Sequence, residues 1–129
     1  MTNKELKNCI MGFPELLCKN IRIIGDNDNF YIEFPFRDLD KNRIIIHVEK
    51  RHDGAVILTD EGQALRYYDD FVKNELNNIR NLFPDISIRE EFLNHRLEVM
   101  LPSCDVFYET IIMLVNAVII LGTWARQGV

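Results

Sequence analysis

Two carboxylates, Asp60 and Glu61, stand where an apolar run ends and a helical pattern begins, in the segment AVILTDEGQAL (residues 55–65). A pair of acids at the mouth of a strand-to-helix turn could carry out general acid–base chemistry. The same residues also fit the start of a helix. Asp60 at the N-cap and Gln63 at N3 would form a capping box, and Glu61 would interact favourably with the helix dipole. We favour this structural role, although Gly62 would allow a backbone or a ligand to approach closely.

A second group of acids follows the segment FYIEFPF. Asp38 and Asp40 lie in a predicted turn, and Glu49 lies in the next predicted strand, two residues before Arg51. This order is faintly similar to the D…ExK arrangement of metal-dependent nucleases, in which two carboxylates hold a metal ion that activates water. Arg51 is a poor substitute for the lysine, because the high pKa of a guanidinium opposes proton transfer. Mixed charges on a strand face also fit a solvated surface with cross-strand pairs.

The spacing of potential ligands predicts no bound metal and no cofactor. Asp38, Asp40 and Asn42 are spaced like the first ligands of a calcium loop, but Arg43 stands where that loop needs glycine. No nucleophile motif or glycine-rich phosphate loop is present. The cysteines form no CxxC pair, and we expect them to be reduced thiols of a cytoplasmic protein. These cysteines are Cys9, Cys18 and Cys104.

The composition is typical of one globular domain, which we place at residues 1–129. Hydrophobic residues make up 47% and charged residues 27% of the 129 residues. A chain of this length can bury a core without disulfides or a structural metal. The formal net charge of −5 provides no global positive field, so nucleic acid and anionic membranes are not indicated as partners. The first residues contain no apolar signal core, which also favours a cytoplasmic protein.

The spacing of apolar residues predicts an α+β fold, with a single antiparallel sheet of about five to six strands packed by helices. Short turns between neighbouring strands imply the antiparallel pairing. The run 55–59 has no polar alternation, so we expect this strand in the centre of the sheet. The predicted helices are 2–13, a further turn at 14–20, 60–83 with a break near 67–71, and 105–128. The predicted strands are 21–25, 30–36, 43–51, 55–59, 86–90 and 95–101.

The last predicted helix is apolar nearly all round, and its apolar run from 111 to 121 is broken only by Asn116. This run is shorter than the roughly 20 residues that span a bilayer, so we expect the helix to be buried in protein and not in a membrane. One face should pack on the sheet, and the helix at 61–83 or a second subunit should cover the other. We favour a homodimer, while Asn116 satisfied within a monomer stays open. The candidate outer stripe is Met113, Asn116, Ile120 and Trp124.

The segment FPFRDLDKNRIIIHVEKRHDGAVILTDEGQAL resembles domain-of-unknown-function family 1828 of bacteria and phages. Members tend to show a TPF…D…D.I.I strand pair, then LTDDG before a helix, and an apolar last helix after a strand similar to RLEVMLP. The resemblance covers the chain from about Ile21 onward. This sequence departs from the pattern at Glu61, where the family often has Asp, and at Phe34, where it often has Thr. The resemblance implies a small cytoplasmic protein of bacteria or mobile elements, and no known activity or cofactor.

The sequence contains no complete catalytic constellation, and therefore favours a non-enzymatic binding or interaction module. A role in phage–host conflict or defence fits the resemblance, and a protein partner fits the module. It would bind through its sheet face or through the loops at 37–43 and 59–63. The candidate binding residues are His47, Arg51, Asp60, Glu61 and Gly62. The alternative is a degenerate metal-dependent nuclease that uses Asp38, Asp40 and Glu49.

Overall fold

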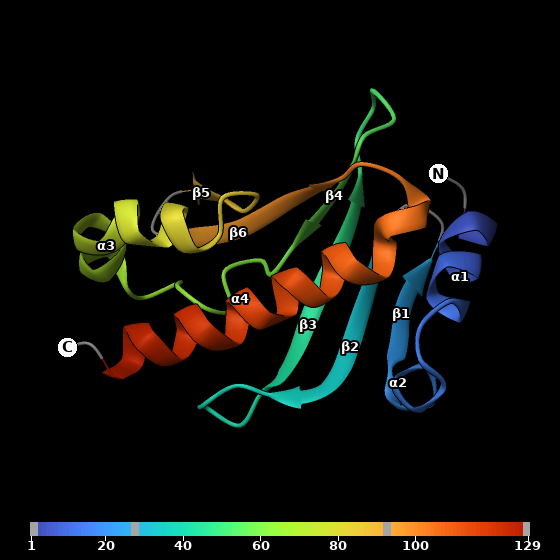
Figure 1. Cartoon of the computed structure of the whole chain (residues 1–129), viewed down its shortest axis with the longest axis horizontal. Helices are drawn as coiled ribbons and strands as arrows, with labels where there is room; N and C mark the ends of the chain where they lie inside the picture. The colour runs from blue at the N-terminus through green and yellow to red at the C-terminus, as the bar shows by residue number, and fades with distance from the viewer. Residues whose placement is uncertain (1–2, 27–28, 92–93, 128–129) are drawn as a thin grey trace.

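A computed structural model of the chain describes residues 3–26, 29–91 and 94–127. Six strands form one sheet in the order β1-β2-β3-β4-β6-β5, and every neighbouring pair is antiparallel (Figure 1). The strands are β1 (Arg22–Asp26), β2 (Asn29–Arg37), β3 (Arg43–Lys50), β4 (Val56–Thr59), β5 (Ser87–Glu91) and β6 (Asn94–Leu101). The helices are α1 (Asn3–Met11), α2 (Glu15–Asn20), α3 (Asp69–Leu82), the 3-10 helix η1 (Cys104–Val106) and α4 (Phe107–Gln127). The predicted α+β fold with a single antiparallel sheet is confirmed.

Strand β4 lies inside the sheet, as its uniformly apolar sequence predicted. All four of its residues are buried, and β4 pairs with β3 on one side and with β6 on the other. The chain leaves β4, forms α3 and the outer strand β5, and then returns as β6 beside β4. This return brings β6 next to the segment that directly follows β4, where the candidate site residues lie.

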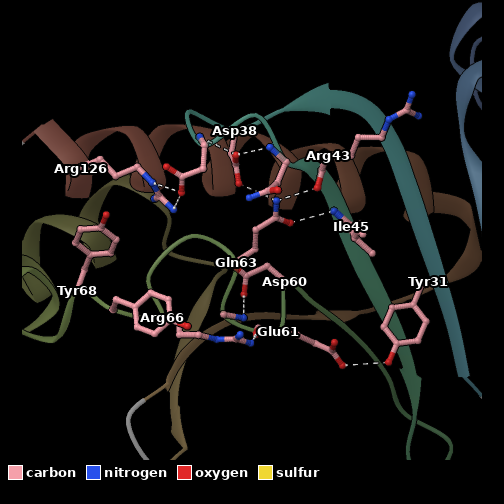
Figure 2. A pocket seen from close by; sticks show the side chains of 14 residues that line it. Tyr31, Asp38, Arg43, Ile45, Asp60, Glu61, Gln63, Arg66, Tyr68 and Arg126 are labelled. Atoms are coloured by element: carbon pink, nitrogen blue, oxygen red, sulfur yellow. Dashed lines mark hydrogen bonds and ion pairs between the residues drawn. The ribbon is translucent and has the colours of Figure 1, made fainter.

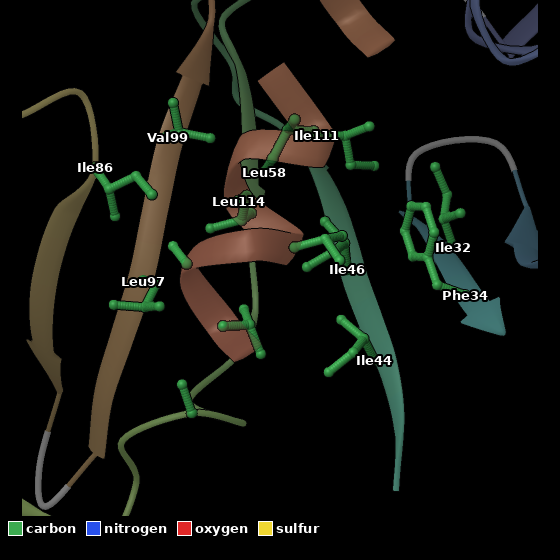
Figure 3. Close-up of a cluster of buried hydrophobic side chains, with 14 of the residues drawn as sticks. Ile32, Phe34, Ile44, Ile46, Leu58, Ile86, Leu97, Val99, Ile111 and Leu114 are labelled. Carbon is green, nitrogen blue, oxygen red and sulfur yellow. The ribbon is translucent and has the colours of Figure 1, made fainter. Parts of the chain in front are cut away.

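Helix α4 crosses one face of the sheet, and the core lies between them (Figures 1 and 3). Alternate side chains of β2, β3, β4 and β6 point to this face, and Ile111 and Leu114 of α4 are fully buried against it. This burial of apolar surface is the main term that stabilises the fold. The sheet residues drawn in Figure 3 include Ile32, Phe34, Ile44, Ile46, Leu58, Leu97 and Val99, and Ile86 precedes β5.

The helix predicted over 60–83 is shorter in the structure. Residues 61–67 form consecutive turns, and α3 begins at Asp69, so the predicted break near 67–71 is confirmed but the helix before it is wrong. Glu61 and Gly62 have φ angles of 51° and 89°, which a right-handed helix does not allow. The helical spacing of apolar residues in this part instead reflects two buried turn residues, Ala64 and Leu65.

Helix α4 is confirmed as the long apolar element at the end of the chain. Together with η1 it forms a helix of 24 residues, Cys104–Gln127, which is long and apolar enough to cross a membrane by length and composition. A helix in the core of a protein passes the same test. In the fold α4 packs on β6, β3 and β4. Its outward side leaves Asn116 and Ile120 exposed.

Cys9 of α1 and Cys104 of η1 form a disulfide, with their Cα atoms 6.1 Å apart. The expectation of reduced thiols is therefore wrong for this pair. The disulfide joins positions 95 residues apart in the sequence, and so attaches the first helix to the start of the last one. Phe13 extends this contact, because its ring packs on Phe107 and Tyr108 at centroid distances of 5.8 and 5.1 Å.

Removing the disulfide should destabilise the fold. For the double variant Cys9→Ser/Cys104→Ser we expect the free energy of unfolding to fall by about 2–4 kcal/mol, because the unfolded chain loses a closure over a long loop. Urea unfolding with and without reductant measures this difference. Reductant should weaken the wild type and leave the double variant unchanged. Equal stability of the two proteins without reductant would contradict the prediction.

Candidate functional site

The turn between β2 and β3 and the segment that follows β4 meet beside the end of α4 (Figure 2). Together they line an open cavity of about 520 Å³. The two loops that the sequence singled out, 37–43 and 59–63, both contribute side chains to this cavity. Arg126 of α4 and the tyrosines of the segment RYY (66–68) complete the lining. This cavity is the candidate functional site.

Asp60 forms the base of the cavity and is nearly fully buried, at 3% exposure. Its Oδ1 accepts hydrogen bonds from the backbone N–H groups of Gly62 (2.8 Å) and Leu97 (2.9 Å), and its Oδ2 accepts one from Ala64 (3.0 Å). Burial raises the pKa of the Asp60 carboxyl, and the three backbone N–H groups oppose that rise. Asp60 therefore has a structural role, in which it holds the turn after β4 and attaches it to β6. The predicted N-cap is wrong, because residues 61–67 form turns and no helix begins here, and for the same reason Glu61 does not lie in a first helical turn.

Gln63 does not complete the predicted capping box with Asp60. Its side chain reaches the exposed end of β3, where Oε1 accepts a hydrogen bond from the N–H of Ile45 (3.1 Å) and Nε2 donates to the carbonyl of Arg43 (2.9 Å) (Figure 2). Nε2 also donates to Oδ2 of Asp38 at 3.0 Å. β4 ends before it can pair with this part of β3, so the amide of Gln63 occupies the place of a strand peptide group.

Position 62 must be glycine because the side chain of Asn94 packs against it. A Cβ at this position would overlap the side-chain amide of Asn94, at the start of β6. The φ of 89° at Gly62 also favours glycine. Asn94 in turn donates a hydrogen bond from Nδ2 to the carbonyl of Glu61 at 3.3 Å. The close approach that the sequence left open is therefore made by β6.

The two acids of the β2–β3 turn are both engaged. Asp38 accepts the backbone N–H groups of Asp40 and Asn42 on Oδ1, each at 2.9 Å, which closes the turn. Asp40 accepts two hydrogen bonds from the guanidinium of Arg126, at 2.8 and 3.0 Å. Arg126 also donates to the carbonyls of Ala64 and of its own helix, and so joins α4 to both loops.

Glu49 lies far from these acids. Arg43 pairs with the last residue of β2, and Glu49 follows six positions later along β3, which corresponds to about 20 Å at the rise of a strand. Two ligands of one metal ion each lie about 2.0–2.6 Å from it. The arrangement that a nuclease would need from Asp38 or Asp40 with Glu49 is therefore not formed. The calcium-loop spacing also begins at Asp38 and ends at Glu49, so its first and last acids are too far apart to bind one ion.

Glu61 and His47 do come together, on the sheet face opposite α4. Nδ1 of His47 lies 3.0 Å from Oε1 of Glu61, and the hydroxyl of Tyr31 donates to the same oxygen at 3.5 Å. The rings of Tyr31 and His47 are stacked with centroids 4.5 Å apart. Burial and the neighbouring Glu61 carboxylate raise the pKa of Tyr31. The group thus connects the loop after β4 to the sheet.

Arg51 and Glu49 belong to ion pairs on this same face. Glu98, in β6, lies 3.7 Å from Arg51 and 3.5 Å from Arg89, and Arg96 lies 4.0 Å from Glu49. The prediction of a charged strand face with cross-strand pairs is confirmed.

The candidate dimer stripe on α4 is only partly exposed. Asn116 and Ile120 face solvent, whereas Met113 and Trp124 are half-buried. Trp124 packs edge-on against Phe71 of α3, with ring centroids 4.9 Å apart. Asn116 also borders an apolar groove of about 340 Å³ between α4, α2 and the end of β2.

Three residues of the cavity were missed by sequence reasoning. Arg126 engages an acid that is distant in the sequence, and this pairing left no local signal. Arg66 and Tyr67 lie in a segment that we predicted as helix, where an exposed tyrosine attracts no notice. Tyr67 is 84% exposed in the structure. Tyr67 is the first residue of the run YYDD, whose two acids were the available signal for an exposed loop.

No family model matches the chain, and no curated protein matches it. The site must therefore be interpreted from its own geometry.

Replacing Asp60 should destabilise the fold strongly. Asp60→Ala leaves buried N–H groups of Gly62, Ala64 and Leu97 without an acceptor, and we expect a loss of about 3 kcal/mol or more. Asp60→Asn keeps one acceptor oxygen and should cost less. Asp53→Asn is the matched control, because Asp53 is exposed and accepts one turn N–H that Asn can also accept, so its effect should stay within about 0.5 kcal/mol. Urea unfolding measures all three, and wild-type stability of Asp60→Ala would contradict the structural role.

Proposed function

We propose that the protein is a non-enzymatic binding module that engages a protein partner through the exposed side chains of residues 37–43 and 61–68, here called the loop surface. The proposal rests on one observation: the acids of the cavity hold the loops in place, and other side chains are left exposed to solvent. The acids Asp38, Asp40 and Asp60 make hydrogen bonds that hold the loops in place. Apart from Asp40, the exposed side chains of these loops are basic or uncharged.

The exposed members of the loop surface are mainly basic and apolar. They include four bases and one acid, and that acid, Asp40, is bonded to Arg126. Tyr67 and Leu39 are 84% and 53% exposed. Tyrosine and arginine are enriched at the energetic centres of protein interfaces. The full set of exposed side chains is Arg37, Leu39, Asp40, Lys41, Asn42, Arg43, Arg66 and Tyr67.

The rigidity of the loops supports binding at low entropic cost. Gln63 attaches the loop after β4 to β3 and to Asp38, and Arg126 attaches both loops to α4. Ordering flexible loops on association costs free energy, so loops that are already held by hydrogen bonds bind with a smaller penalty. The four bases favour a partner that presents acidic side chains around an apolar anchor. The resemblance to family 1828 supports a role in bacteria or phages, including phage–host conflict.

The loop surface is tested with a matched pair of double variants. Tyr67→Ser/Arg66→Glu alters the surface, whereas Leu82→Ser/Arg80→Glu makes the same kind of change on exposed residues of α3. We expect a protein captured from host extract by the wild type and by the α3 variant to be lost from the loop variant. Titration of that purified partner should show an affinity about tenfold or more weaker for the loop variant, and weaker binding at high salt.

Equal affinity of all three proteins for the captured partner would contradict the proposal. Cleavage of single- or double-stranded nucleic acid by the pure protein with Mg²⁺ or Mn²⁺ would also contradict it and would reopen enzymatic chemistry.

The homodimer stays a prediction, which the exposed apolar side of α4 supports. Ile120 is 48% exposed at the centre of that side, and we expect Ile120→Glu to sediment as a monomer where the wild type sediments as a dimer. Met100→Glu is the matched control, because Met100 is 59% exposed on the opposite face of the sheet. Sedimentation velocity at micromolar concentration measures the state. A wild-type monomer would contradict the dimer.

A further inference from the structure

Three potential metal ligands from different elements meet at the end of the β5–β6 hairpin, beside the first residue of α3. Glu90 of β5 lies directly across from His95 of β6 in the antiparallel register. Asp69, the first residue of α3, places Oδ1 at 2.8 Å from Nε2 of His95. One ligand atom from each of the three residues lies within 4.8 Å of the other two.

The three side chains differ in burial, from a buried imidazole to an exposed carboxylate. The His95 side chain is 4% exposed, that of Asp69 is 43% exposed, and Glu90 is exposed. The imidazole is therefore fixed by its surroundings, with Nε2 directed at a carboxylate. The two carboxylates lie on the solvent side, where an ion can enter. A fixed imidazole with adjustable acids suits a site that must bring its ligands about 2 Å from one ion.

The ligand types select the class of metal. Imidazole nitrogen suits Zn²⁺ and other transition metals, whereas Mg²⁺ and Ca²⁺ prefer sites built from oxygen ligands alone. One nitrogen and two carboxylate oxygens supply three of the four positions of a tetrahedral Zn²⁺ site, and water can fill the fourth. All three residues lie in secondary structure, which limits how far they can move apart.

Lys73 forms an ion pair with one acid of this cluster. Its Nζ lies 2.8 Å from Oδ2 of Asp69, one turn along α3. Lys73 leaves Oδ1 to His95, but its charge would repel a metal ion bound there.

We propose that Asp69, Glu90 and His95 form a binding site for one divalent transition-metal ion, with Zn²⁺ as the first candidate. The site shares no residue with the loop surface, and it adjoins that surface where Asp69 follows Tyr68. Its bound ion would join α3 to the β5–β6 hairpin.

The test is isothermal titration of the full chain, with its disulfide intact, after dialysis against a chelator. We expect the wild type to bind one equivalent of Zn²⁺ and not to bind Mg²⁺ in the same range. Binding should weaken as the pH falls, because imidazole must be unprotonated to bind a metal. Loss of an outer-shell partner alone typically lowers metal affinity by about 10–100-fold, so Glu90→Gln and Asp69→Asn should each lower it by at least about tenfold.

Lys73→Gln should raise the affinity for Zn²⁺, since it removes the competing charge. Lys19→Gln is the matched control, because Lys19 forms the same kind of ion pair with Glu15, one turn apart on α2, and its removal should leave the affinity unchanged. His95→Gln alters a buried residue, so the wild-type protein provides the second readout: Zn²⁺ should shift the Nε2 resonance of His95 in its NMR spectrum.

Absence of saturable Zn²⁺ binding to the wild type would overturn the site. So would an unchanged affinity in Glu90→Gln and Asp69→Asn, or an unshifted His95 resonance in the Zn²⁺-saturated wild type, because the ion would then lie elsewhere. An affinity of Lys73→Gln equal to that of the wild type would also count against an ion beside Asp69.

Discussion

The buried carboxylate of Asp60 is the interaction on which the arrangement of the candidate site depends. It accepts three backbone N–H groups, two from the turn that follows β4 and one from Leu97 in β6. Buried N–H groups without an acceptor are costly, and a charged acceptor makes stronger hydrogen bonds than a neutral one. One side chain thus determines how the chain leaves the central strand and where β6 lies beside it.

The hydrogen bonds that continue from Asp60 are made by side chains to backbone groups of other elements. Gln63 pairs with β3 where β4 has already ended, and Arg126 joins the end of α4 to the carbonyl of Ala64 and to Asp40. The Gln63 contacts take the place of strand pairing at the end of β3, where β4 no longer lies beside it. They also explain why residues that resemble catalytic acids in the sequence have structural roles.

The two faces of the sheet differ in chemistry. One face packs its apolar side chains against α4, and this contact accounts for most of the core. The other face carries ion pairs such as Arg51 with Glu98, in which each charge is neutralised by a neighbour on the next strand or the one beyond. Glu98 is only 8% exposed, so its carboxylate would be costly there without these partners. Four exposed bases and the exposed Tyr67 lie where the loops after β2 and β4 meet.

The sequence by itself determined the order of the elements, the α+β class, the central position of β4 and the structural role of Asp60. Each of these follows from local periodicity or from a residue's bonds to its immediate neighbours. It also brought the loops at 37–43 and 59–63 to attention, and both line the cavity. The prediction of a helix from residue 60 was wrong, because the positive φ angles of Glu61 and Gly62 interrupt the helix that the apolar spacing predicted.

Only the tertiary structure decided which distant residues meet. The pairing of Arg126 with Asp40, the disulfide of Cys9 with Cys104, and the approach of Asp69 to His95 all join positions that no local pattern connects. The separation of Asp38 from Glu49, by contrast, follows from the strand that the sequence predicts at 43–51. The physical reason is that contacts between distant residues are fixed by how strands pair and helices pack, and this packing depends on the whole chain at once.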